Sequence, residues 1–192
     1  MLSKIFLIRH GETEWSRSGQ HTSRTDLPLT PNGEAVARNL VGRLAGKQFA
    51  HVFVSPRRRA QQTCQLAGFG SKAQVEPRLS EWDYGDYEGL TSPAIHKDRP
   101  GWTIYRDGCP NGESPEQIAA RADSLIGDLR KLTGDIVVFS HGHFLRILGI
   151  RWVAQPVLEA RHFGLDTASI SILGYEHDCL DMPIIQQWNA VS

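Results

Sequence analysis

The chain has 192 residues, 40% of them hydrophobic, and its 21 Lys and Arg residues balance its 21 Asp and Glu residues. This length suits a single domain, residues 1–192, with one well-buried core. Zero net charge gives no overall field that would favour nucleic acid or an acidic membrane surface as a partner. The chain shows no long apolar run and no signal-peptide pattern, and its three cysteines include no CxxC pair. We therefore expect a cytoplasmic protein that neither spans a membrane nor depends on disulfides.

The first predicted strand ends in residues suited to chemistry on an anion. Residues 5–8 form a short apolar run typical of a buried strand, and Arg9, His10 and Gly11 follow directly. Ligands of open α/β sheets bind where strands end and loops begin. A lone Arg-His pair is most often an ordinary surface pair, so this motif needs support from elsewhere in the chain.

Two later strands supply that support. Residues 51–54 form a strand pattern that leads through Ser55-Pro56 to the cations at 57–59, and residues 135–139 form another that leads to His141 and His143. Parallel strands end at the same edge of a sheet, so these side chains can meet there. Three such endings together predict a functional site.

Helix signals alternate with these strands. Thr30 and Pro31 predict an N-cap and first helical residue, and Gly46 predicts that helix's end. Ser114 and Gln117 form a capping-box pattern ahead of a helix that runs towards residue 134. This order predicts a largely parallel sheet with helices on both faces. The other predicted helices are 57–67, 92–97 and 144–154, and the other predicted strands are 75–79, 169–173 and an edge strand at 183–188.

Two stretches are predicted to be loop-rich. Residues 16–25 are polar and contain Gly19, which predicts a loop that walls the site. Prolines and glycines punctuate residues 82–113 and prevent long elements there, so we expect an excursion that caps the site.

Five motifs stand in order along the chain: Arg9-His10-Gly11-Glu12-Thr13, Ser55-Pro56-x-x-Arg59-Ala60-x-x-Thr63, Glu81 with Tyr84-Gly85-x-x-Glu88-Gly89, Gly112-Glu113-Ser114 and His141-Gly142. Together, these motifs resemble the histidine phosphatase superfamily, in its phosphoglycerate-mutase-like branch. The resemblance implies a three-layer α/β/α fold with a mostly parallel central sheet. Local strings at 15–22, 81–89 and 106–113 look closest to the sedoheptulose-bisphosphatase and acid-phosphatase members, although Ser16 and Ser23 stand where many relatives have Asn and Gly.

The chemistry of phosphate esters and the resemblance lead to the same catalytic assignments. A neutral imidazole is a competent nucleophile for phosphorus, and we expect His10 to form a phosphohistidine. Arg9 and Arg59 can offer paired donors to phosphate oxygens. We expect His141 to be protonated and to stabilise charge on the transferring group. Glu81 is the expected general acid, which protonates the leaving oxygen and then activates water.

Further residues are candidates for substrate contact, and Trp102 is expected to line the pocket. A zinc site at His10, His141 and His143 is an alternative, but two arginines in the same pocket would repel a divalent cation, so we expect no metal and no cofactor. The candidate substrate-binding residues are Ser16, His21, Thr22, Tyr84, His143 and Arg146.

The predicted function is hydrolysis of phosphate monoesters without a metal. The partner is a small phosphorylated metabolite, and the resemblance implies a sugar phosphate or bisphosphate. One alternative is a phosphoglycerate-type mutase, which must exclude water from its intermediate and would do so less easily with a short middle segment. Another is a phosphate-binding module that does not turn over. The apolar edge at residues 184–185 would permit a homodimer.

Overall fold

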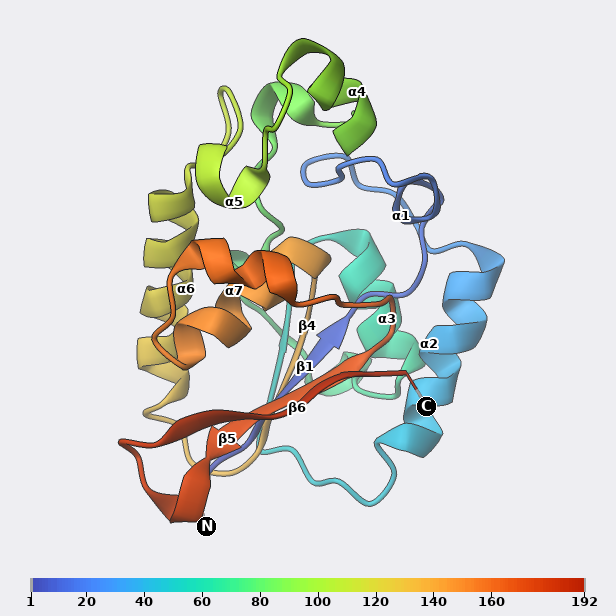
Figure 1. Ribbon diagram of the computed structural model, residues 1–192. Coiled ribbons are helices and arrows are strands. Elements are labelled where there is room, and N and C mark those ends of the chain that lie inside the picture. The colour runs from blue at the N-terminus through green and yellow to red at the C-terminus, as the bar shows by residue number, and fades with distance from the viewer. Residues whose placement is uncertain (1, 192) are drawn as a thin grey trace.

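The computed structural model describes residues 2–191 as a six-stranded sheet with helices on both faces (Figure 1). The strand order is β3-β2-β4-β1-β5-β6. Strands β1 to β4 are parallel to one another, and β5 pairs antiparallel with both of its neighbours, β1 and β6. The mostly parallel sheet is therefore confirmed. The strands are β1 (Ile5–Arg9), β2 (His51–Val54), β3 (Gln74–Val75), β4 (Ile136–Ser140), β5 (Ile170–Tyr175) and β6 (Pro183–Ala190).

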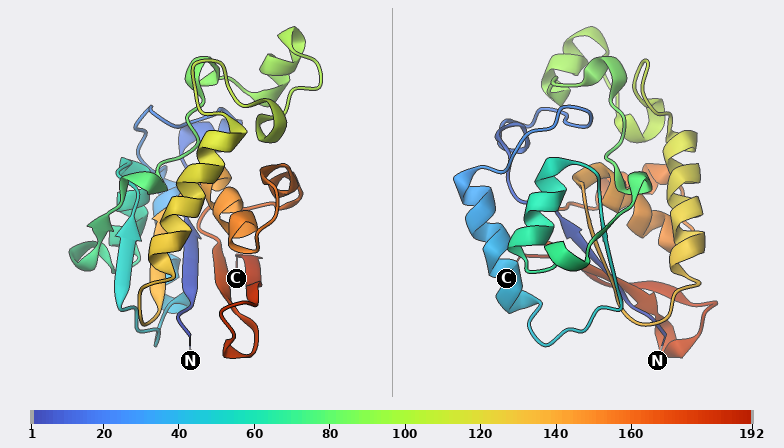
Figure 2. Two further views of the ribbon diagram at one scale, coloured as in Figure 1. Left: turned by 90° about the vertical axis from the view of Figure 1, so that its left-hand side faces the viewer. Right: turned by 180° about the vertical axis from the view of Figure 1, so that it is seen from behind.

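Strand β1 is buried on both faces, which explains its uninterrupted apolar run. Ile5 and Leu7 pack into the core on one side of the sheet, and Phe6 and Ile8 pack into the core on the other. Helices α2 and α3 cover one face and α6 and α7 the other (Figures 1 and 2). The helices are α1 (Glu14–Ser18), α2 (Pro31–Arg43), α3 (Arg58–Leu66), α4 (Ser92–Asp98), α5 (Ile104–Asp107), α6 (Pro115–Leu129) and α7 (Gly142–Trp152).

The predicted helix caps are confirmed. The Thr30 hydroxyl accepts a hydrogen bond from the Gly33 N–H at 3.0 Å, and Ser114 forms a reciprocal capping box with Gln117. Helix α2 ends at Arg43 rather than at Gly46, because a turn with Gly46 in the left-handed region follows it. Caps thus mark helix starts well, while the ends depend on the last turn.

Three local predictions need correction. The expected loop at residues 16–25 begins inside a short helix, α1, whose first N–H groups are capped by Thr13. The expected strand at 75–79 is limited to β3, because Pro77 begins a 3₁₀ turn that ends at Leu79. The middle segment contains α5 in addition to the expected helix α4.

Residues 82–113 leave the sheet and lie beyond the carboxyl ends of its parallel strands, at the top of Figure 1. The two ends of this segment are joined by hydrogen bonds from Asp86 N–H to the Pro110 carbonyl and from Glu113 N–H to the Asp83 carbonyl, each 2.9 Å long. The His21 N–H donates to the Leu90 carbonyl at 2.8 Å, which connects the loop after α1 to this segment. Two distant stretches therefore form one wall above the sheet.

The register of the sheet brings three strand ends to one level. Arg9 pairs with Ser140, and the His10 N–H donates to the Ser140 carbonyl at 2.9 Å. Val54 pairs with Phe139 on the other side of β4. The residues that follow these three strands therefore begin side by side. No helix within residues 2–191 is long and apolar enough to cross a membrane.

Candidate active site

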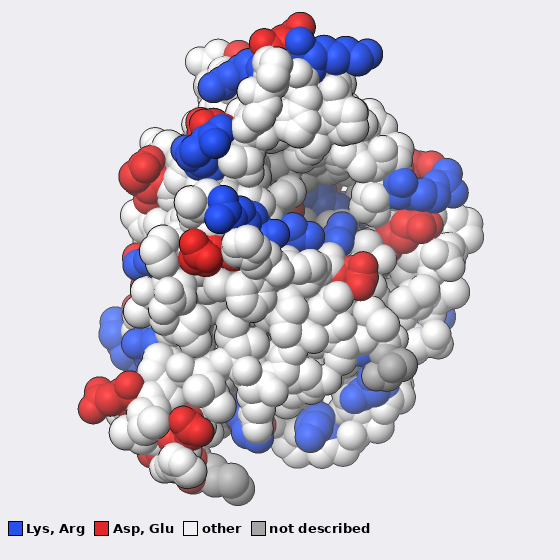
Figure 3. Space-filling model, viewed as in Figure 1, with Lys and Arg blue, Asp and Glu red and all other residues white. Residues whose placement is uncertain are grey.

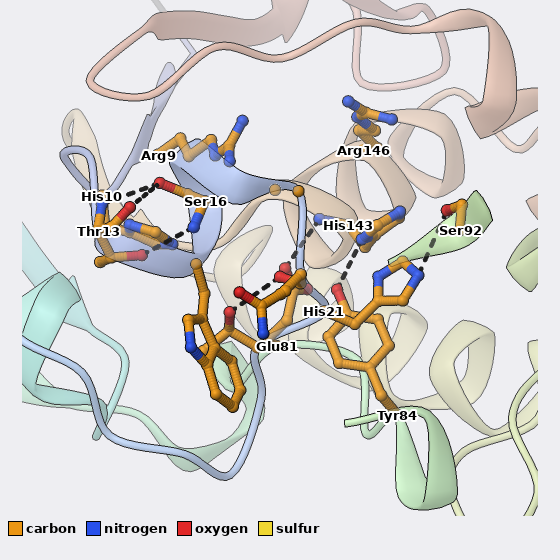
Figure 4. Close-up of a pocket in the computed structure, with 15 residues that line it drawn as sticks. Arg9, His10, Thr13, Ser16, His21, Glu81, Tyr84, Ser92, His143 and Arg146 are labelled. Carbon is orange, nitrogen blue, oxygen red and sulfur yellow. Dashed lines mark hydrogen bonds between the residues drawn. The ribbon is translucent and has the colours of Figure 1, made fainter. Parts of the chain in front are cut away.

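A pocket of about 250 Å³ opens at the carboxyl ends of β1 and β4. Figure 3 shows it as a hollow with cationic atoms at its edge, and Figure 4 shows the side chains that line it. Two predicted residues, Arg59 and His141, are not among the lining residues and are fully buried beneath them. The predicted residues that line the pocket are Arg9, His10, Ser16, His21, Thr22, Glu81, Tyr84, His143 and Arg146.

The imidazole of His10 is held in one tautomer. Its Nδ1 lies 2.7 Å from the Gly11 carbonyl oxygen, and since a carbonyl only accepts, Nδ1 must carry the proton. Burial, together with the charges of Arg59 and Arg9, holds the pKa of His10 well below its usual range. The ring is therefore neutral, and Nε2 has the free lone pair that a nucleophile needs.

Arg9 is half-buried beside this ring. One of its terminal nitrogens donates to the Leu165 carbonyl, while its Nε is buried and makes no hydrogen bond to any residue in the described part of the chain. A Cβ on Gly142 would lie 3.3 Å from that Nε, so the glycine leaves room for the guanidinium. Arg9 lines the pocket, where its guanidinium can meet an oxyanion.

In the free site His141 is arranged as a neutral ring, and the expectation that it is protonated during phosphoryl transfer stays a prediction. Its Nδ1 accepts a hydrogen bond from Arg59 Nε at 3.2 Å, and its Nε2 lies 2.7 Å from the Ser55 hydroxyl. Burial and the neighbouring Arg59 charge hold the pKa of His141 well below its usual range. Its ring is 5.1 Å from that of His10, edge to face. The two imidazoles therefore lie together as neutral groups.

Arg59 makes more contacts with protein than the expected fork to phosphate suggests. Its terminal nitrogens donate to the carbonyl oxygens of Thr25 at 3.1 Å and Thr22 at 3.0 Å, and more weakly to that of Ser23. The guanidinium thus binds the loop at residues 22–25 to the floor of the site. This role was not evident from the sequence, because these carbonyls lie more than 30 residues away in the chain.

The carboxylate of Glu81 is held at the N-terminus of α7. Its Oε1 accepts from the backbone N–H groups of Trp82 at 2.9 Å and Phe144 at 2.8 Å, and its Oε2 accepts from that of His143 at 3.1 Å. Backbone N–H groups at a helix N-terminus bind an anionic group well. Oε2 makes fewer hydrogen bonds than Oε1.

Polar and aromatic groups line the side of the pocket away from His10. The Tyr84 hydroxyl lies 2.7 Å from Nδ1 of His143, and the His21 ring lies 4.6 Å from the Tyr84 ring. Burial lowers the pKa of His21 to about 4, so it is neutral near pH 7. Arg146 donates to the Tyr105 hydroxyl at 2.9 Å, and its Nε is buried with no hydrogen-bond partner in the described residues. This side of the pocket therefore has a second cation.

The prediction that Trp102 lines the pocket is wrong. The Trp102 ring lies 5.8 Å from the His21 ring, and its indole N–H donates to the Gly108 carbonyl at 2.9 Å. The tryptophan is buried behind His21 and supports it from the far side.

Several lining residues were not predicted to contact substrate. Trp15 packs against Gly89, where an added Cβ would lie 3.1 Å from the indole ring, and Gln20 donates to the Gly89 carbonyl at 2.9 Å. Both belong to the local string at 15–22, which was the available signal. Ser92 lies with its hydroxyl 3.4 Å from His21 Nε2. No sequence pattern marked Ser92, because its place depends on a contact across 71 residues.

The histidines of the suggested zinc site are engaged in other contacts. Nδ1 of His10 is bound to a carbonyl, both ring nitrogens of His141 have partners, and Nδ1 of His143 lies against Tyr84. Across residues 2–191, no group of three or more His, Cys, Asp or Glu side chains is arranged to hold a metal ion.

Comparisons with known proteins agree with this site. Residues 5–190 match the family model of the histidine phosphatase superfamily (branch 1). An acid phosphatase of Mycobacterium tuberculosis is 42% identical over 95% of this chain and 91% of its own, and a sedoheptulose 1,7-bisphosphatase of Saccharomyces cerevisiae is 34% identical over the same shares. The solved structure of an open reading frame from M. tuberculosis superposes with a TM-score of 0.90 at 40% identity, covering 98% of this chain and 97% of that one. The chain belongs to branch 1 of the histidine phosphatase superfamily and is a phosphoric monoester hydrolase.

Proposed function

We propose that His10 is the nucleophile in the hydrolysis of phosphate monoesters of small metabolites, with sugar phosphates and bisphosphates as the main substrate class. The observation that carries the proposal is the state of His10: a neutral ring with its proton on Nδ1 and its Nε2 lone pair free. Arg9 and Glu81 line the same pocket. A nucleophile, an anion-binding cation and a proton donor are thus brought together.

The reaction has two balanced steps. The reaction starts with His10 neutral and Glu81 protonated. In the first step, the Nε2 lone pair of His10 attacks phosphorus, the ester P–O bond breaks, and the leaving oxygen takes the proton from Glu81. In the second, a water molecule gives a proton to the Glu81 carboxylate while its oxygen bonds to phosphorus. The electrons of the P–N bond return to Nε2, and orthophosphate leaves. Each residue ends in the state in which it began.

The remaining catalytic residues act through charge. Arg9, which lines the pocket, binds phosphate oxygens through its guanidinium, and Arg59 adds positive charge from beneath while it holds the wall of the pocket. A bound phosphate dianion opposes the positive charges that hold His141 neutral. Substrate binding therefore favours the protonated form of His141, which can then donate to the transferring group.

The pocket has two cations, Arg9 beside His10 and Arg146 on α7. Their presence is the reason to propose a substrate with two anionic groups. Arg9 binds the phosphate that is transferred, and Arg146 binds the second anionic group or a polar part of the sugar. The names of the bisphosphatase and phosphatase relatives agree with this class. The residues proposed to contact the rest of the substrate are Ser16, His21, Thr22, Tyr84 and His143.

The test is phosphate release from a panel of esters in the presence of EDTA, for the intact protein and for His10→Ala. The panel holds p-nitrophenyl phosphate, sugar mono- and bisphosphates, and 3-phosphoglycerate. Release that survives EDTA and is lost in His10→Ala supports the proposal. His177→Ala is the matched control, because the His177 side chain is 82% exposed. Isomerisation of 3-phosphoglycerate without phosphate release would instead establish a mutase. Binding of a phosphate ester with neither release nor isomerisation would establish a non-catalytic module.

The proposal also covers the organisation of the protein. We infer one catalytic domain over residues 1–192, in which the segment 82–113 caps the site, and a cytoplasmic location, which the three free cysteines support. A homodimer through β6 is part of the same proposal, because β6 ends the strand order and its Ile184 and Ile185 are only half-buried. Sedimentation velocity of the intact chain decides between monomer and dimer.

A further inference from the structure

We propose that Arg121, on helix α6, is a positioning residue that holds Glu81 in place for proton transfer. Arg121 does not line the pocket that contains His10, and no motif of the sequence singled it out. The inference rests on the proposed function, because it concerns the residue to which that function assigns the proton.

The guanidinium of Arg121 binds the backbone that leads into Glu81. Nη1 donates to the carbonyl oxygens of Arg78 and Ser80, each at 2.7 Å, and Nη2 donates to the Glu81 carbonyl at 3.3 Å. Three carbonyls within four residues thus converge on one planar cation. An ammonium group has no comparable fork of donors, so this arrangement is specific to arginine.

A second set of contacts binds the residues that follow Glu81. Arg121 pairs with the Glu113 carboxylate through two hydrogen bonds, of 2.8 and 2.6 Å. The same carboxylate accepts from the Asp83 N–H at 2.9 Å, and the Glu113 carbonyl accepts from the Trp82 indole at 3.0 Å. The Arg121–Glu113 pair therefore contacts the chain on both sides of Glu81.

A third contact connects Arg121 to the side chain of Glu81. The Arg121 guanidinium lies 4.5 Å above the Phe144 ring, and the Phe144 N–H donates to Oε1 of Glu81 at 2.8 Å. One cation thus contacts both the backbone of Glu81 and the residue that binds its carboxylate. Movement of the guanidinium would shift both.

Glu81 depends on these polar contacts because a hollow lies behind it. A second pocket of about 250 Å³ is lined by Ser80, Glu81, Glu113 and Arg121. Close-packed side chains, which elsewhere hold a residue in place, are missing on that side. Loss of Arg121 would leave room for the 78–81 backbone to move away from the reacting groups.

The dependence of the rate on the leaving group distinguishes positioning from general stability. An alkoxide leaving group needs the proton from Glu81, whereas p-nitrophenolate leaves readily without it. The parameter to compare is kcat/KM, because it reports the first step and not the later attack of water. A misplaced Glu81 lowers kcat/KM for β-glycerophosphate much more than for p-nitrophenyl phosphate.

The experiment measures the ratio of these two kcat/KM values in four proteins: the intact chain, Glu81→Gln, Arg121→Lys and Arg151→Lys. Glu81→Gln should lower the alkyl-to-aryl ratio by about 10²- to 10⁴-fold. Arg121→Lys should lower it by at least about tenfold, since a shift of about 1 Å can cost 10²-fold. Arg151→Lys is the control, because Arg151 of α7 pairs with Asp123 of α6 through two bonds of 2.8 Å at the surface. Its ratio should be unchanged.

Two further variants test the same contacts. Glu113→Gln weakens the pair from its other side and should lower the ratio in the same direction. In Arg121→Ala, added guanidinium ion should restore the β-glycerophosphate rate selectively.

The outcomes separate the two proposals. Equal loss on both esters in Arg121→Lys, or the same change of ratio in Arg151→Lys, would overturn the positioning role. If Glu81→Gln leaves the ratio unchanged, the assignment of Glu81 as general acid fails. If Glu81→Gln changes the ratio and neither Arg121→Lys nor Glu113→Gln does, only the role of Arg121 fails.

Discussion

The Nε of Arg59 donates to Nδ1 of His141 at 3.2 Å, and both side chains are fully buried. The remaining nitrogens of Arg59 donate to carbonyls of the loop at residues 22–25. A single guanidinium therefore orients the second imidazole of the site and holds one wall of the pocket.

Arg59→Lys should lose both stability and activity. One ammonium cannot reach all the acceptors, and the buried groups left without a donor should lower the free energy of unfolding by about 3 kcal/mol. We expect kcat/KM for p-nitrophenyl phosphate to fall by about 10²-fold, as when one preorganised donor is removed. Urea unfolding and initial rates measure the two effects. Arg58→Lys, at the exposed neighbouring position, is the control, and equal behaviour of the two variants would contradict this account.

The stability of the protein should fall as the pH drops below about 6.5. Burial holds the pKa of His10 and His141 well below the usual range and lowers that of His21 to about 4. Well above pH 6.5 these groups are neutral in both states, so they contribute no pH dependence there. Below it the unfolded chain binds protons that the folded chain does not, and each group contributes a slope of up to about 1.4 kcal/mol per pH unit.

The measurement is urea unfolding between pH 7.5 and 4.5. His21→Gln removes one buried titrating group, so the decline between pH 6.5 and 4.5 should become shallower. His177→Gln changes an exposed histidine and should leave the decline as it is. A His21→Gln profile parallel to that of the intact chain would show that burial of His21 does not shift its titration.

Two glycines of helix α2 should respond to alanine in opposite ways. A Cβ on Gly33 would lie 2.2 Å from the Glu12 carbonyl oxygen, and one on Gly11 would lie 2.5 Å from the Gly33 carbonyl oxygen. Gly33→Ala therefore pushes the start of α2 away from the turn that carries His10, at a cost of about 3 kcal/mol. Gly42 has nothing within 4 Å of an added Cβ. Gly42→Ala should stabilise the helix by about 0.5–1 kcal/mol.

Thermal unfolding and p-nitrophenyl phosphate hydrolysis measure this pair of variants. Gly33→Ala should lower both the melting temperature and kcat, while Gly42→Ala should raise the melting temperature and leave kcat unchanged. Equal effects of the two substitutions would mean that the close approach of α2 to the turn determines neither the melting temperature nor kcat.

The close approach of Gly33 to Gly11 explains why position 11 is a glycine. A glycine directly after a strand suggests a sharp turn, but Gly11 does not adopt a positive φ. It is small because another backbone, that of Gly33, comes within contact distance. A turn is a local property, whereas that contact joins two segments 22 residues apart.

The local pattern was sufficient for the elements that position the site. Apolar runs predicted β1 and β4, because a strand buried on both faces shows its burial in consecutive residues. The run at residues 52–54 predicted β2, whose burial alternates between its two faces. Thr30 and Ser114 marked the starts of α2 and α6, because a cap is made within four residues of the chain. Motif order then indicated the family that the comparisons show.

The tertiary structure alone decided the chemical state of the site. The charge of His141 depends on its burial and on Arg59, 82 residues away, so its neutral form could not be inferred from its neighbours in sequence. The placement of Trp102 behind His21 and the support of Glu81 by Arg121 depend on contacts of the same long-range kind. Helix and strand signals are carried by nearby residues, whereas desolvation and charge–charge interactions depend only on distances in space.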